Sequence, residues 1–283
     1  MKIALASFEN LPEWQNEDKS LIAELESLGA VVQTPAWNSR IDWEKFDSTI
    51  IRTTWDYHTQ SKEYLDWASN VPRLFNSFPI VKWNINKSYL RELESKGIPI
   101  APTVWIQNNI RTSVAEVICE LQTNTGFIKP LVGACASDTL RFSVNELDQA
   151  QSFLDARINQ EMMIQPYLRS VESEGELSGI FVAGEFTHGV QKIPVQGDYR
   201  VQDDFGAEDR PYTFTKEEIH AMKDIFNHVP DGNNLLYARV DYLRADDGSL
   251  LLNELELIEP SMFFRHSDDG HKKFAKAIMQ TIN

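Results

Sequence analysis

Two runs typical of β-strands surround the dipeptide Asp247-Gly248, and these runs contain several carboxylates. Asp-Gly favours a two-residue hairpin turn, because both residues of that turn must accept a positive φ. A two-residue loop here places four charged side chains on one face of the hairpin in two opposed pairs, Asp241 with Glu254 and Arg239 with Glu256. Opposed carboxylates destabilise a sheet, so these three carboxylates require a cation. Hard oxygen ligands of this kind suit Mg²⁺ or Mn²⁺.

The same hairpin has a second interpretation. Val240 and Leu255 meet on its other face, as a buried face requires. Arg239 could then neutralise a solvated acidic face with no metal present. The hairpin alone does not choose between these readings, so the elements that precede it in the chain must decide what its carboxylates do.

The composition argues against several classes of protein. The chain of 283 residues is long enough for two domains, and its 27 basic and 42 acidic residues give a net charge of −15. A surface for nucleic acid or an anionic membrane needs a basic footprint, which this balance disfavours. We find no signal peptide and no apolar run of transmembrane length. Cys119 and Cys135 have neither metal nor disulfide spacing, so we expect a globular protein of the reducing cytoplasm.

Strand and helix signals alternate at the N-terminus. Short apolar runs predict strands at residues 2–7, 30–34 and 48–52, and residues 16–28 have helical periodicity. This order favours a parallel, doubly wound sheet, whose ligands bind beyond the carboxyl ends of the strands.

The segment after the third of these strands combines a cation, hydroxyls, a carboxylate and aromatic rings. We predict substrate contacts for these side chains, namely Arg52, Thr53, Trp55, Asp56 and Tyr57. In the alternative interpretation, Trp55 and Tyr57 pack beneath the following helix and Arg52 pairs with Asp56.

A loop rich in small residues follows the strand predicted at residues 126–129. Small side chains at residues 130–139 let backbone N–H groups approach an anion closely. No Gly-Lys-Ser/Thr sequence closes this loop, so it is not a Walker A motif. The remaining signals are strands at 162–168, 177–182 and 186–193, a polar loop at 197–206 that could cover a substrate, and a helix at 216–229.

Five motifs in a fixed order give the chain a resemblance to a known family. They are Arg-x-Thr-Trp-Asp-Tyr from Arg52, Trp-Asn-x-x-Lys ending at Lys87, Gln165-Pro-Tyr-Leu, Glu174-Gly-Glu176, and Glu-Leu-Glu-x-Ile-Glu-Pro-Ser from Glu254. In this order the chain resembles the ATP-grasp superfamily, and within it the glutathione-synthetase-like ligases. It is similar to the O-ureido-serine cyclo-ligase group of cycloserine biosynthesis and its relatives, and the resemblance covers essentially the whole chain.

The resemblance implies an α/β fold that is α+β in its C-terminal part. Residues 1–86 would be a doubly wound pre-ATP-grasp domain that contacts substrate, 87–165 a small subdomain with the phosphate loop, and 166–283 a subdomain with the metal hairpin.

The resemblance also implies roles for individual site residues. The nucleotide would contact Lys87, Lys129, Gly133, Ala134, Ser137, Gln165, Tyr167, Leu168 and Glu176, with Glu176 on the ribose. The metal would bind Asp241, Glu254 and Glu256, with Glu256 standing where many relatives have Asn. Lys192 and Arg200 would be catalytic, near the γ-phosphate and the substrate carboxylate.

The implied activity is an ATP-dependent carboxylate–amine ligase. ATP phosphorylates a small amino-acid-like carboxylate, an amine-type nucleophile attacks the acyl phosphate, and ADP and phosphate leave. Cations are needed because a carboxylate approaches a polyanion. Two alternatives stay open: a phosphotransferase on the same fold, or a nucleotide-binding regulatory module without turnover. The two predicted catalytic residues also have alternatives without a catalytic role: Lys192 could pair with Asp198 on the surface, and Arg200 could pair with Glu208. We expect no nucleic-acid or membrane partner, and a homodimer is possible.

Overall fold

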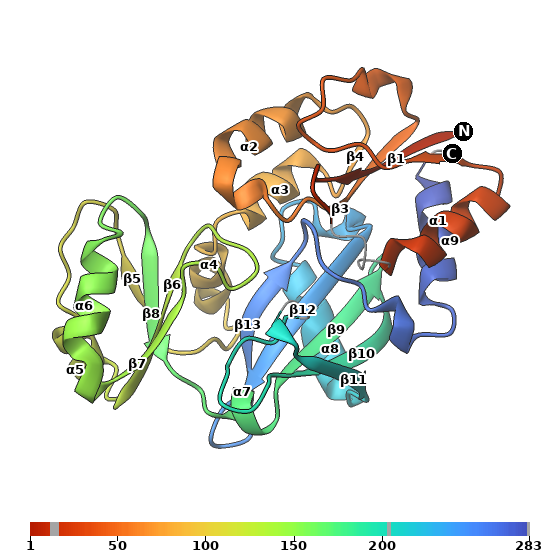
Figure 1. Cartoon of the computed structure of the whole chain (residues 1–283). Helices are drawn as coiled ribbons and strands as arrows, with labels where there is room; N and C mark the ends of the chain where they lie inside the picture. The colour runs from red at the N-terminus through yellow and green to blue at the C-terminus, as the bar shows by residue number, and fades with distance from the viewer. Residues whose placement is uncertain (12–16, 203–204, 282–283) are drawn as a thin grey trace.

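The computed structural model describes residues 1–11, 17–202 and 205–281. These residues form three β-sheets, each with helices packed on it (Figure 1). The first helix, α1 (Glu17–Ser27), lies beside the last, α9 (Gly270–Gln280), so segments from both ends of the chain share one core.

The first sheet is parallel, with the strand order β2-β1-β3-β4. Its strands are β1 (Lys2–Ser7), β2 (Val31–Gln33), β3 (Ser48–Thr53) and β4 (Leu74–Phe75). Its other helices are α2 (Ser61–Asn70), α3 (Phe78–Asn84) and the 3₁₀ turns Trp43–Lys45 and Tyr57–Gln60. Ile50 packs with α1 and α9, whereas Ile51 packs with α2 and α3, because successive strand residues face opposite sides. The predicted strands and their parallel pairing are confirmed, and Asn16 lies outside the described residues.

The second sheet is antiparallel, with the order β5-β8-β6-β7. Its strands are β5 (Val104–Ile106), β6 (Thr125–Pro130), β7 (Leu140–Ser143) and β8 (Met162–Pro166). The helices are α4 (Tyr89–Ser95), α5 (Val114–Glu120), α6 (Leu147–Asp155) and the 3₁₀ turn Val144–Glu146. Ile128 and Ile164 pack in one core with α5 and α6. Strand alternation therefore directs their neighbours Lys129 and Gln165 to the other face of the sheet.

The third sheet is antiparallel, with the order β11-β10-β9-β12-β13. Its strands are β9 (Glu176–Val182), β10 (Glu185–Ile193), β11 (Glu208–Tyr212), β12 (Tyr237–Arg244) and β13 (Leu250–Glu256). The helices are α7 (Ser170–Ser173), α8 (Lys216–Phe226) and the 3₁₀ turns Gly232–Asn234 and Phe264–His266. Helix α8 lies so close to β9 that a Cβ on Gly179 would lie 2.4 Å from the sulfur of Met222. Glycine is needed there for helix and sheet to meet.

The predicted pairing across the β12–β13 hairpin is confirmed, but the predicted loop is one residue too short. Both opposed charged pairs and the Val240–Leu255 pair have the predicted register. However, the Ala245 N–H donates to the Ser249 carbonyl at 2.8 Å, which leaves Asp246 to Gly248 as the loop. Gly248 has a φ of 86°, the left-handed conformation that a three-residue hairpin loop requires.

A β-bulge in β13 compensates for the longer loop. Leu252 pairs with Tyr242, whereas Glu254 pairs with Asp241, so Asn253 is an extra residue opposite no partner. One additional residue in the loop and one in the strand cancel, and the carboxylates regain the predicted register.

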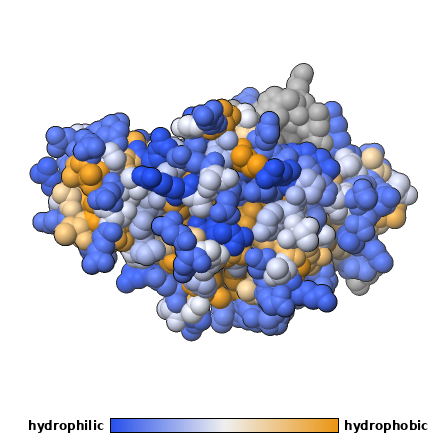
Figure 2. Space-filling model, turned by 90° about the horizontal axis from the view of Figure 1, so that it is seen from below, coloured by the Kyte–Doolittle hydropathy of each residue, from blue (hydrophilic) through white to orange (hydrophobic). Residues whose placement is uncertain are grey.

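The face of the molecule seen in Figure 2 is mostly hydrophilic, and apolar side chains form only small, separate patches on it. Among the described residues, no helix combines the length and apolarity needed to cross a membrane.

Candidate active site

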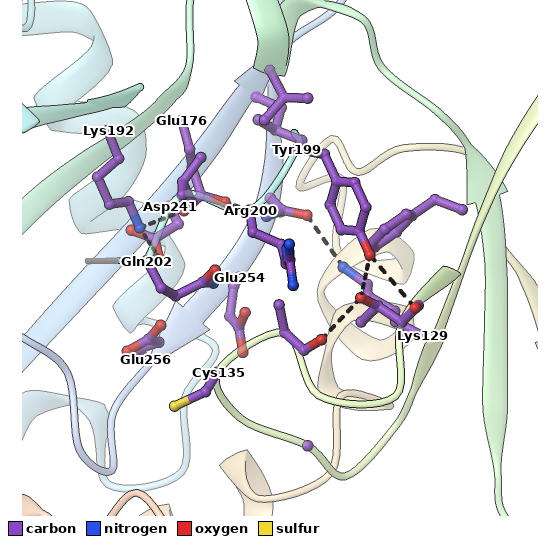
Figure 3. A pocket seen from close by; sticks show the side chains of 18 of the residues that line it. Lys129, Cys135, Glu176, Lys192, Tyr199, Arg200, Gln202, Asp241, Glu254 and Glu256 are labelled. Carbon is purple, nitrogen blue, oxygen red and sulfur yellow. Dashed lines mark hydrogen bonds and ion pairs between the residues drawn. The ribbon is translucent and has the colours of Figure 1, made fainter. Parts of the chain in front are cut away.

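A cavity of about 230 Å³ lies where residues of the second and third sheets and their loops meet. The structure brings all fourteen predicted nucleotide, metal and catalytic residues to its wall, from Lys87 on the connection before α4 to Glu256 on β13. Figure 3 shows the arrangement: Lys192, Glu176 and Asp241 gather on strands at one side, Lys129 and Tyr199 lie at the other, and Arg200 points between them.

The deepest carboxylate is held by three donors. Asp241 is 1 % exposed and accepts hydrogen bonds from Ser178 Oγ at 2.6 Å and from Arg239 Nε at 3.0 Å. Lys192 Nζ lies 3.3 Å from its other oxygen. Burial alone would raise the pKa of Asp241, but Arg239 and Lys192 outweigh it and hold this pKa at about 2. Asp241 is therefore ionised throughout the physiological range.

Arg239 also donates to the carboxylate of Glu256, so one guanidinium holds residues on both strands of the hairpin. Burial raises the pKa of Glu256 to about 7, and the nearby carboxylates Asp241 and Glu254 add to the rise that Arg239 opposes. Arg239 thus contacts Glu256, the residue that the predicted register places opposite it.

Lys87 joins the hairpin to the predicted phosphate loop, which is the loop of small residues at 130–139. Its Nζ lies 2.9 Å from Glu254 Oε1 and donates to the Gly133 carbonyl at 2.8 Å. The Lys87 backbone N–H donates to Leu131, at the start of the same loop. Tyr89 Oη accepts the N–H of Leu255, so the segment around Lys87 also satisfies the backbone of the edge strand β13. Displacing this lysine would disturb both sides of the cavity.

Asn253 links two further predicted nucleotide contacts, Lys129 and Glu176. Lys129 Nζ donates to Asn253 Oδ1 at 3.2 Å, and the amide of Asn253 donates to Glu176. At the predicted hinge, the Tyr167 N–H already donates to Thr125 and the Gln165 side chain donates to Thr103. Any adenine contact of this hinge must therefore use its other backbone groups.

The phosphate loop adopts left-handed backbone conformations without glycine. Cys135, Ala136 and Asp138 have φ values of 53°, 52° and 56°. None of the three is a glycine, and successive backbone N–H groups in left-handed conformations form concave sites that suit anions. A hydrogen bond of 2.9 Å joins Thr139 Oγ1 to Tyr199 Oη, so this loop is tied to the loop after β10 across the cavity.

The surface ion pairs considered for Lys192 and Arg200 are absent from the described residues. Lys192 is 4 % exposed and pairs with Glu176 and Asp241 inside the cavity. Arg200 pairs with Asp198 and not with Glu208: its NH2 lies 2.7 Å from Oδ2. Arg200 lines the cavity while held by a partner two residues away in its own loop.

The first-sheet segment differs from the prediction. Of its five residues, Trp55 lines the cavity, and its Nε1 donates to the Glu259 carbonyl at 3.2 Å. The others bond elsewhere in ways that stabilise the fold: Arg52 to Asp18 and the Pro260 carbonyl, Thr53 to Ser7, Asp56 to Trp37, and Tyr57 in an apolar core. The alternative pair of Arg52 with Asp56 is not formed either. These four residues do not line the cavity, so their direct contact with substrate stays a prediction.

The donor set fits a divalent cation in part. Within the described ranges no three acidic, His or Cys side chains form a ready-made metal cluster, and each predicted ligand is paired with a cationic side chain. Glu254 and Glu256 retain side-chain exposures of 29 % and 24 % and have hard oxygens, so they fit the metal best. Asp241 is almost completely buried and both its oxygens accept from cationic side chains, which makes it the weakest of the three candidates.

Glu259 and Asn253 are among the cavity residues on or beside β13 that sequence reasoning missed. Glu259 lines the cavity beside Trp55, and burial, followed by the charges of Glu256 and Glu254, raises its pKa well above the usual range. Asn253 lines it because of the bulge. A signal for the bulge existed: Leu252 and Leu255 are both core residues, an odd number of positions apart.

Comparison with known proteins connects this geometry to a family. Residues 96–260 match the family described as RimK-like ATP-grasp domain, and residues 3–76 match the N-terminal domain of D-cycloserine synthetase DcsG. The chain belongs to the RimK-like ATP-grasp family. The predicted ATP-grasp fold and the prediction of an ATP-dependent ligase that forms C–N bonds are thereby confirmed.

Individual relatives extend the likeness over the whole chain. The cycloserine biosynthesis protein DcsG of Streptomyces lavendulae is 26% identical over 93% of this chain and 92% of its own. The crystal structure of D-cycloserine synthetase DcsG superposes with a TM-score of 0.91 at 23% identity, covering 100% of both chains. The D-alanine–D-alanine ligase from Bacillus anthracis has a TM-score of 0.70 at 16% identity, covering 100% of this chain and 97% of its own. As an ATP-grasp enzyme, the chain uses ATP with a divalent metal and a small substrate.

Proposed function

We propose that this ATP-grasp enzyme activates a small amino-acid-like carboxylate as an acyl phosphate and closes it onto an amine-type nitrogen of the same molecule. The observation that supports this most strongly is the likeness to D-cycloserine synthetase over all of both chains, including the N-terminal region. A cycloserine ring contains an amide-type bond within one molecule, which is the product of an intramolecular ligation. ADP and phosphate are the other products.

The cavity residues divide the work of phosphoryl transfer. Lys87 and Lys129 would offset the charge of the nucleotide phosphates, and Lys192 and Arg200 the charge that develops on the transferring group. Arg200 must exchange Asp198 for the substrate or phosphate to do so. The attacking substrate oxygen bonds to the γ-phosphorus as the bond to ADP breaks. The nitrogen then attacks the carbonyl carbon, and phosphate leaves.

A divalent cation would bind through Glu254 and Glu256, with Asp241 as the third predicted ligand; we propose Mg²⁺, with Mn²⁺ as a substitute. When bound, it neutralises phosphate charge. The chain itself supplies orientation and water exclusion. The bond between Thr139 and Tyr199 ties two loops together over the cavity, which would protect an acyl phosphate from hydrolysis.

The three sheets suggest the same division of the chain that the sequence predicts: residues 1–86, 87–165 and 166–283. We retain this division as a proposal. Cytoplasmic location and a homodimer likewise stay predictions.

An ATP assay tests the proposed activity. The purified chain is incubated with ATP, Mg²⁺ and O-ureido-serine as the single organic substrate, and ADP, free phosphate and product mass are measured. A cyclo-ligase releases one ADP and one phosphate per substrate. Ring closure removes one water and leaves the carbamoyl group on the ring nitrogen; hydrolysis of that group then gives a free cycloserine ring, with a net loss of CO₂ and NH₃ from the substrate. A phosphotransferase would instead leave phosphate on the product, and an intermolecular ligase would need a second substrate.

Glu254→Gln tests the metal role in the same assay. It should lower kcat by about 100-fold or more, because a hydrogen-bonding amide keeps the shape but loses the charge. Glu185→Gln is the matched control, since Glu185 is 80 % exposed on the far end of β10 and should not affect turnover. Unchanged ATP consumption in Glu254→Gln would contradict the metal role.

A further inference from the structure

Asn253 and its neighbour Glu254 both face the cavity because of the β13 bulge. Leu252 and Leu255 both pack in the core of the third sheet. In a regular strand, residues three apart lie on opposite faces, so one inserted residue is required to bring both leucines inward. The bulge meets that requirement and turns Asn253 into the cavity beside Glu254.

The Asn253 amide bridges a cation and an anion. Its Oδ1 accepts a hydrogen bond from Lys129 Nζ at 3.2 Å, and its Nδ2 donates to Oε2 of Glu176. Lys129 and Glu176 are each 6 % exposed. Among side chains of this size, a primary amide provides both an acceptor for the ammonium and a donor for the carboxylate. The polarity of the contact therefore matches Asn.

Glu176 is held by two different donors on its two oxygens. Lys192 Nζ pairs with Oε1, whereas Asn253 donates to Oε2. With both oxygens engaged, the plane of the carboxylate is defined. Without Asn253, one oxygen would lose its partner and the carboxylate could turn about its last torsion, which is broad in the absence of contacts.

We propose that Asn253 is a positioning residue that orients the Glu176 carboxylate for the ribose hydroxyls of the nucleotide. Through Lys129, the same amide couples ribose recognition to the phosphate end of the site. The inference rests on the proposed function, in which Glu176 accepts hydrogen bonds from the ribose. It adds to that function a role for Asn253: by orienting Glu176, this residue determines the selectivity for the ribose of the nucleotide.

Calorimetric binding of ADP, 2′-deoxyADP and 3′-deoxyADP with Mg²⁺ tests the proposal without turnover. The unaltered chain should bind ADP about tenfold more tightly than at least one deoxy analogue, the size expected for one hydrogen bond to a charged group. Asn253→Ala should reduce this preference to about twofold or less, as should Glu176→Gln. Asn253→Asp keeps an acceptor for Lys129 but cannot donate to Glu176, so it should also lose the preference.

A control separates positioning from damage to the hairpin. Ser249→Ala removes the turn bond that Ser249 Oγ donates to Asp247 at 2.6 Å, keeps the backbone N–H bond to the same carboxylate at 2.9 Å, and does not touch the cavity. It should keep the full ribose preference. Melting temperatures of all variants, measured without nucleotide, show whether a loss of selectivity coincides with a loss of fold.

The outcomes are distinguishable. If the unaltered chain prefers ADP and Asn253→Ala keeps that preference, Asn253 has no positioning role although the proposed function stands. If the unaltered chain binds ADP without preference, the ribose role of Glu176 is wrong and the inference fails with it. If the chain binds no ADP at all, the proposed function and the inference are both wrong.

Discussion

The ammonium group of Lys129 should make nucleotide binding depend on pH. Lys129 lies on β6, is 6 % exposed, and has Asn253 as its hydrogen-bond partner. Burial lowers its pKa from 10.5 to about 8, and the charge of Lys87 adds to the effect while Glu254 and Glu176 oppose it. At 1.36 kcal/mol per pKa unit, the cavity disfavours the charged form by about 3 kcal/mol.

The direction in which pH changes the affinity depends on which protonation state of Lys129 the nucleotide favours. Nucleotide phosphates attract the protonated lysine, so binding above pH 8 must take up a proton. Affinity should be nearly independent of this group below pH 7. It should then fall by up to about tenfold per pH unit above pH 8, until the pKa of Lys129 in the complex is reached.

Calorimetry measures this directly. ADP is titrated at pH 7 and pH 9 in pairs of buffers with different ionisation enthalpies, which gives the protons taken up per nucleotide. We expect about 0.1 proton from Lys129 at pH 7 and about 0.9 at pH 9. Lys129→Arg should remove the uptake at pH 9, because a guanidinium stays charged. Equal uptake at both pH values, or uptake that persists in Lys129→Arg, would refute the reasoning.

Two further variants test the backbone and the loops around the cavity. Gly175→Ala should destabilise the fold by more than about 3 kcal/mol, because φ is +76° and a Cβ would lie 2.1 Å from the Lys192 carbonyl oxygen. Gly184→Ala is its control: φ is +77° but nothing lies within 4 Å, so chemical denaturation should show a loss of only about 1 kcal/mol, and equal losses would argue against the close contact. Tyr199→Phe removes the hydroxyl that ties the two loops together and should weaken ADP binding by about two- to tenfold with little change in melting temperature. Unchanged affinity would mean that the loops close independently of that bond.

The order of the elements could be predicted because each depends on local patterns. β1 and β3 each contain a short apolar run, at residues 3–6 and 50–51, and Asp247-Gly248 favours a turn between strand-like segments. Alternation within strands then predicted which charged residues share a face. Those features need only neighbours in sequence, so the hairpin pairing of Asp241 with Glu254 could be derived correctly.

The partners of individual side chains could not be predicted in the same way. Arg52 lies near the carboxyl end of the parallel strand β3, where ligands of such sheets bind, but Asp18 on α1 pairs with it and only 1 % of it is exposed. That pairing exists because α1 packs on the first sheet. Arg200 similarly has a partner, Asp198, that was weighed only for Lys192. Competition among several nearby charges is decided by three-dimensional distance.

The sequence by itself determined the charged face of the hairpin, the family and the kind of chemistry, because strand alternation and ordered motifs are properties of the chain. Tertiary structure decided how that face is used. The third residue in the loop and the bulge at Asn253 offset each other, and only core packing of Leu252 and Leu255 requires the bulge. Only the fold brings Lys87 and Lys192 to the carboxylates, since Lys87 lies on the connection before α4 and Lys192 lies on β10.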